Sequence, residues 1–168
     1  MSEKITKFED VIKRIEEMKK TGGVDLSSEE DLSIAIMNLL GIEEHLFFTG
    51  EKTGKDEYFD ILNEVRTLRT KLLRKMIDKT EGETWCISKH LLATSYRLME
   101  VGTKLLSEGK KDEAKDFFDE SYKMYSIFFA LRLKVLDVCQ IKDLAKEESE
   151  KPWKLQDIVA KLVDCCNE

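Results

Sequence analysis

Two short stretches of the chain hold the residue types that bind transition metals. Glu43, Glu44 and His45 are consecutive, whereas Cys86 and His90 are four positions apart, which places their side chains on one face of a helix. Carboxylate, thiolate and imidazole groups can together ligate one metal ion. If the two helices meet at one end of the fold, Glu44, His45, Cys86 and His90 form a metal site.

The same residues also have a plainer interpretation. Glu43 lies on an apolar stripe, where a carboxylate is costly to bury unless it is paired or bound to metal. The helix end can instead emerge into water at this point. Cys86 and His90 fall opposite the stripe that contains Leu91 and Leu98, on a face that solvent can cover. The repeated Glu-x-x-His pattern of di-iron bundles is absent, so we expect the solvent-exposed arrangement ahead of the metal site.

A pocket for a small ligand is another chemical possibility. Glu43 and Glu64 would supply its carboxylates, and Arg66 and Arg97 would anchor an anion. The sequence holds no glycine-rich phosphate loop, no nucleophile elbow and no His-Glu-x-x-His motif. It therefore assigns no catalytic residue and favours a protein that is not an enzyme.

Apolar residues recur every three or four positions along almost the whole chain, which is the period of an α-helix. The pattern predicts an all-α fold without strands. Six helical segments are expected, at about 4–20, 27–48, 55–79, 85–108, 112–145 and 152–168. Short connections favour antiparallel neighbours. We expect one domain over 1–168, an up-down antiparallel bundle of five to six helices, with an N-terminal amphipathic helix (1–22), a core bundle (27–146) and a C-terminal helix (152–168).

Two of these segments carry more detailed expectations. The second is apolar on most sides, so it should be the buried centre of the bundle, and Gly50 and Gly54 should end it. The third should turn an apolar stripe inward and a basic side to solvent. The stripe consists of Tyr58, Ile61, Leu62, Val65, Leu68, Leu72 and Met76, and the basic side of Arg66, Arg69, Lys71, Arg74 and Lys75.

The predicted hairpin over 92–129 resembles one tetratricopeptide motif. Gly102, Gly109, Ala114 and Phe118 have the spacing of that motif, and Ser121 stands where the family usually has alanine. The resemblance implies two helices in close contact at the small residues. It covers one repeat, with no second copy at a period of about 34 residues, and a generic helical hairpin is the alternative.

A further resemblance covers residues 39–133. The stretch Gly82–His90 (GETWCISKH), with Glu43, Glu44 and His45 upstream, is similar to a group of small, uncharacterised bacterial helical proteins. The resemblance implies a bacterial, cytoplasmic protein. It brings no activity, cofactor or catalytic residue with it.

Composition narrows the partners that we expect. A net charge of −6 disfavours binding to the phosphate backbone of a nucleic acid. The N-terminus lacks the apolar run of a signal peptide, and no uncharged apolar run reaches about 18 residues, so no membrane segment is expected. The four cysteines include no Cys-x-x-Cys pair, which favours reduced thiols in the cytoplasm.

Two functions from different classes follow from these patterns. The preferred one is a non-enzymatic helical module that forms a homo-oligomer or binds a protein partner through an apolar helix face. Its support is the surplus of apolar and aromatic residues in the second and fifth segments. The alternative is a small helical bundle that binds a transition metal or another ligand in a polar pocket of Glu, His and Cys side chains.

Overall fold

The structure, a computed structural model, describes residues 26–134, which form helices joined by short turns. The helices are α2 (Leu26–Thr53), α3 (Glu57–Met76), the 3-10 turn η1 (Lys79–Glu81), α4 (Glu83–Ser107) and α5 (Lys111–Arg132). The predicted all-α class is confirmed. Within the described part there are four α-helices rather than five to six, because the helices expected at 4–20 and 152–168 lie outside the described residues.

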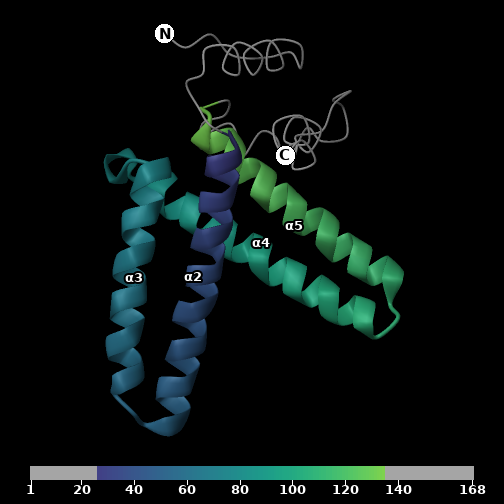
Figure 1. Cartoon of the computed structure of the whole chain (residues 1–168). Coiled ribbons are helices and arrows are strands. Elements are labelled where there is room, and N and C mark those ends of the chain that lie inside the picture. The colour runs from purple at the N-terminus through teal and green to yellow at the C-terminus, as the bar shows by residue number, and fades with distance from the viewer. Residues whose placement is uncertain (1–25, 135–168) are drawn as a thin grey trace.

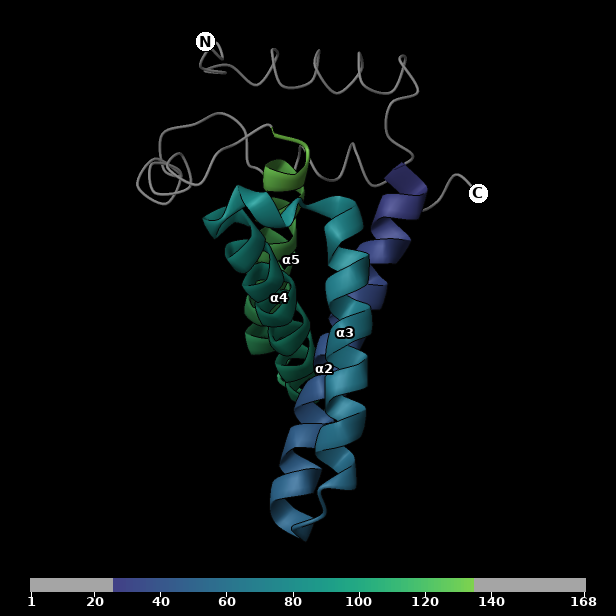
Figure 2. The same cartoon turned by 90° about the vertical axis from the view of Figure 1, so that its left-hand side faces the viewer.

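The four helices form two antiparallel hairpins that lie one behind the other. Figures 1 and 2 show α2 beside α3 in one layer and α4 beside α5 in the other, with α4 crossing α2 at an open angle. Both hairpins run from the same end of the molecule and spread apart in Figure 1, where the α2–α3 tip points down and the α4–α5 tip points down and to the right. Gly54 and Gly109 stand at these tips with positive φ angles, a backbone conformation that glycine adopts without strain.

The core lies at the end of the molecule where α2 begins and α5 ends. Its buried side chains come from all four helices: Ile36, Met37, Leu73, Met76, Ile77, Leu92, Ile127, Phe128, Phe129, Ala130, Leu131 and Leu133. Arg132 of α5 donates two hydrogen bonds of 2.7 Å to the carboxylate of Glu29 on α2. The hydroxyls of Tyr125 and Ser33 lie 2.7 Å apart, within hydrogen-bonding distance. The first turns of α2 are therefore fastened to the last turns of α5.

Three of the helix contacts place an aromatic ring over a glycine. The Phe59 ring of α3 lies over Gly50, the Tyr96 ring of α4 over Gly41, and the Phe118 ring of α5 over Gly102. A Cβ atom at Gly50 would come within 2.7 Å of the Phe59 ring, so the ring takes the space of the missing side chain. The expectation that Gly50 ends its helix is wrong for this reason, since α2 continues through it to Thr53.

The inward stripe of α3 is shifted from its expected position. Ile61 and Leu68 are exposed, whereas Arg69 and Leu73 are buried. The sequence expectation for these residues is wrong because Arg69 has a partner inside the fold, which changes the side of the helix that can be covered.

Candidate functional site

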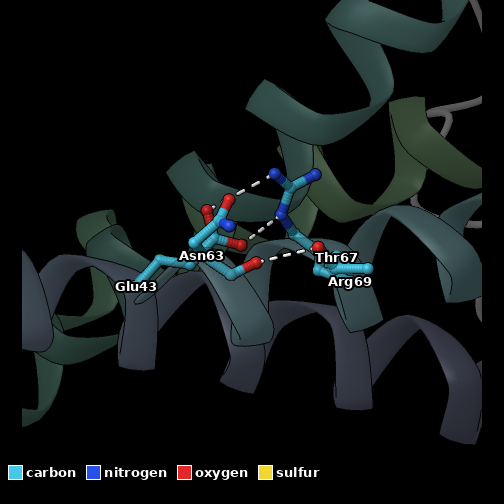
Figure 3. A network of polar contacts seen from close by, with 4 residues as sticks. All are labelled: Glu43, Asn63, Thr67 and Arg69. Carbon is cyan, nitrogen blue, oxygen red and sulfur yellow. Dashed lines mark hydrogen bonds and ion pairs between the residues drawn. The ribbon is translucent and has the colours of Figure 1, made fainter. Parts of the chain in front are cut away.

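Glu43 and Arg69 form an ion pair in the contact between α2 and α3. The Arg69 guanidinium donates from Nε and from a terminal nitrogen to the two carboxylate oxygens of Glu43. Figure 3 shows the pair, with Asn63 and Thr67 on neighbouring turns of α3, where the Thr67 hydroxyl donates to the Asn63 carbonyl. The side chains of Arg69 and Glu43 are 5% and 15% exposed. Glu43 therefore lies mostly buried between α2 and α3 rather than in water, and Arg69 compensates its negative charge.

The sequence analysis placed Glu43 correctly on an apolar stripe but did not find its partner. Arg69 is four residues after Val65 and four before Leu73, so it shares the apolar face of α3. A basic residue on that face, opposite an acidic residue on the apolar face of the preceding helix, was the available signal. Bidentate geometry suits arginine, because its planar fork matches a carboxylate.

A groove opens where α4 crosses α2. It encloses about 760 Å³. Its lining comes from two helices: Asn38, Gly41, Ile42, Glu44, His45, Leu46, Phe48 and Lys52 of α2, and Tyr96 and Arg97 of α4. The groove therefore mixes apolar side chains with both signs of charge.

The α4 wall of the groove is held by contacts of two neighbouring residues. Arg97 forms an ion pair with Glu44, and its guanidinium carbon lies 5.2 Å from the centroid of the Tyr96 ring. The same ring packs against Gly41 of α2. The Arg97 and Glu44 side chains are 48% and 41% exposed, so this pair orients the wall and adds little stability.

Only part of the predicted site comes together in this groove. Glu44, His45 and Arg97 line it. Glu43 is turned to α3 instead, and Glu64, Arg66, Cys86 and His90 are exposed and do not line the groove. In residues 26–134, no group of three or more His, Cys, Asp and Glu side chains is arranged to hold a metal ion.

Burial changes the acidity of one tyrosine at the α2–α5 contact. The pKa of the Tyr125 hydroxyl rises to about 12, mainly because burial disfavours the charged phenolate, while the hydrogen bond with Ser33 acts in the opposite direction. The pKa of Glu30, one turn before Ser33, is also raised by burial and by the neighbouring Asp31. Tyr125 is thus neutral and positioned for packing at any physiological pH.

One side of α2 remains open to solvent although the helix is strongly apolar. Ile34, Ile42, Phe47 and Phe48 are 44–50% exposed. The expectation of a fully buried central helix is wrong, because α3 and the crossing α4 cover only part of its circumference. Ser27–Thr53 is the one described stretch that is long and apolar enough to cross a membrane, a test that core helices and signal sequences also pass. The expectation of no membrane segment stays a prediction.

Comparisons with known proteins assign no family to this chain. No family model, no curated protein and no solved structure matches it.

Proposed function

We propose that this chain is a non-enzymatic helical module that associates, with itself or with a protein partner, through the exposed apolar side of α2. The observation that carries the proposal is the set of large apolar side chains left at the surface of α2, of which Phe48 is half exposed. Contiguous apolar surface beside polar groups is typical of interaction sites. The tetratricopeptide-like hairpin of α4 and α5 serves in this proposal as the support behind the groove.

The oligomeric state of the full chain tests this proposal. Sedimentation velocity from low to high micromolar concentration should give a mass above that of the monomer. A Phe48→Ser variant should reduce association, whereas Val101→Ser, which alters an exposed apolar residue of α4, should not. A monomer at every concentration that also fails to bind any helical partner would contradict the proposal.

A second candidate function is binding of a metal or a small anionic ligand in the groove. It is favoured by the polar groups that converge there, namely His45, Lys52 and the Glu44–Arg97 pair. The metal arrangement would also need Cys86 and His90, which do not line the groove. Elemental analysis should then find stoichiometric metal that His45→Ala removes, since His45 is the histidine that lines the groove. Metal-free protein whose Tm does not change on addition of zinc, iron or copper would contradict it.

A further inference from the structure

The exposed side of α2 carries a regular row of residues, which we call the outer face. Its positions are Asp31, Ile34, Asn38, Gly41, His45, Phe48 and Lys52, separated alternately by three and four residues. At 3.6 residues per turn these positions fall within an arc of about 100°, with Ile42 at its border. This is the spacing with which one helix packs along another.

Within residues 26–134, this face is covered only at its middle, where the Tyr96 ring of α4 lies over Gly41. The α3 contact uses the side of α2 that carries Glu43 and Gly50, and Tyr96 of α4 reaches the outer face only at Gly41. Ile34 and Phe48 are 44% and 50% exposed. Asp31 and Lys52 are also exposed, and neither forms an ion pair with another described residue.

The outer face is complementary to itself when it is reversed end to end. Asp31 lies ten residues before Gly41 and Lys52 eleven after it, so opposite charges stand at similar distances from the middle. Two apolar residues, Ile34 and Phe48, stand seven before and seven after. The polar pair Asn38 and His45 stands three before and four after, and the middle position, Gly41, lies under the Tyr96 ring.

A two-fold axis through the middle of the face therefore places opposite charges near each other and apolar residues near apolar residues. In such a dimer every contact occurs twice: if residue i of one copy contacts residue j of the other, residue j of the first copy also contacts residue i of the second. Asp31 then lies within about a turn of Lys52 of the second copy, and Ile34 lies near the second copy's Phe48. A parallel pair would instead place Asp31 near its own counterpart and Lys52 near its own, which is repulsive.

We propose that a second copy of this chain covers the outer face, with the two α2 helices antiparallel about an axis at Gly41 and Ile42. This inference rests on the proposed function and names the surface and the partner. The Tyr96 ring of α4 fills the space over Gly41, so the second helix contacts Ile34 and Asn38 on one side of this ring and His45 and Phe48 on the other. The groove beside α4 leaves the α2 side chains on either side of the Tyr96 ring accessible to a partner.

Charge reversal tests the arrangement without altering the core. Asp31→Lys places two lysines together at both ends of the dimer, and Lys52→Glu places two acids together. Each single variant should weaken dimerisation about tenfold or more, because the symmetry repeats the repulsion. An equimolar mixture of the two variants should restore the dimer, since the introduced lysine of one chain then meets the introduced glutamate of the other, and the unchanged Lys52 meets the unchanged Asp31. Glu51→Lys, an exposed change one residue from the face, is the matched control and should leave association unchanged.

The outcomes separate this inference from the proposed function. Sedimentation of the full chain and its variants, with far-UV circular dichroism to verify folding, gives the readout. Restoration by mixing supports the antiparallel dimer. If the wild-type chain associates but neither reversal weakens it, or mixing restores nothing, the inference is overturned while self-association stands. If the wild-type chain is monomeric at all concentrations, the inference is overturned, and the face is left for residues 4–20 or for another protein.

Discussion

Replacing Arg69 by methionine should destabilise the protein far more than an ordinary surface change. The substitution keeps the length and apolar character of the side chain but leaves the Glu43 carboxylate, 15% exposed, without its counter-charge. Breaking a buried pair from one side costs about 3–5 kcal/mol. Because Glu43 keeps some contact with water, we expect about 3 kcal/mol, which is a large share of the 5–15 kcal/mol that stabilises a typical domain.

Replacing both partners should recover most of this loss. In Glu43→Leu/Arg69→Met no charge remains buried, and two apolar side chains fill the contact between α2 and α3. Substitution of a whole buried pair by apolar residues is often neutral or stabilising. We therefore expect the double variant to lie within about 1 kcal/mol of the wild type, so that the two single changes couple by more than about 2 kcal/mol.

Urea unfolding followed by far-UV circular dichroism measures these free energies. Arg97→Met is the matched control, since it removes an arginine from the exposed pair with Glu44 and should cost no more than about 1 kcal/mol. Equal losses for Arg69→Met and Arg97→Met, or single effects that simply add in the double variant, would refute the conclusion that the Glu43–Arg69 pair is internal and coupled.

Three more predictions concern the contacts between helices. Gly102→Ala should lower the Tm, because its Cβ would lie 2.6 Å from the Phe118 ring and 3.2 Å from the Ala114 carbonyl. Overpacking costs about 1–3 kcal/mol, which exceeds the roughly 1 kcal/mol that alanine gains in helix propensity. A higher Tm would count against this packing. Tyr125→Phe should resist alkali better than the wild type. The pKa of Tyr125 is about 12 in the folded protein and about 10 in the unfolded chain, so the unfolded chain loses this proton first as the pH rises. Relative to the variant, the stability of the wild type therefore falls by about 1 kcal/mol per pH unit above about pH 10. Parallel urea titrations of both proteins from pH 8 to about 11 measure this difference, and identical pH profiles would contradict it. Ser95→Ala should lower the free energy of unfolding in urea by about 1 kcal/mol, since the Ser95 and Ser121 hydroxyls each donate to the other residue's carbonyl across the buried α4–α5 contact. The control is Ser107→Ala, an exposed change that removes only a hydrogen bond within α4. Equal losses for the two variants would argue against a buried contact.

The helices themselves were predictable from the sequence because their signals are local. Apolar spacing indicated α2 to α5, and Gly54 and Gly109 mark the hairpin tips, where positive φ angles favour glycine. The interior glycines could not be distinguished from helix ends in this way. Gly50 lies within α2 under the Phe59 ring of α3, whereas Gly54 has a positive φ angle and no heavy atom within 4 Å of the place where a Cβ would be.

Pairing between helices was the part that the sequence did not determine. Leu68, Leu72 and Leu73 lie on neighbouring turns of α3 and are all candidates for the core. Which face of α3 is buried therefore depends on whether Arg69 has an acidic partner within the contact. Glu43 stands out in the sequence as a carboxylate on an apolar stripe, but spacing along the chain does not predict that Arg69 is its ion-pair partner. The groove likewise depends on the angle at which α4 crosses α2, and Cys86 and His90 are left outside it by that angle.

The ion pair between Glu29 and Arg132 has a consequence for the order in which the molecule is completed. It joins residues 103 positions apart, and the core beside it mixes side chains from α2 with side chains from α5. During synthesis from the N-terminus, α2 leaves the ribosome long before α5 exists. The surface of α2 that α5 covers in the folded protein therefore stays exposed until Arg132, 103 residues after Glu29, has been synthesised, and until then α2 must remain soluble with only α3 and α4 to shield it.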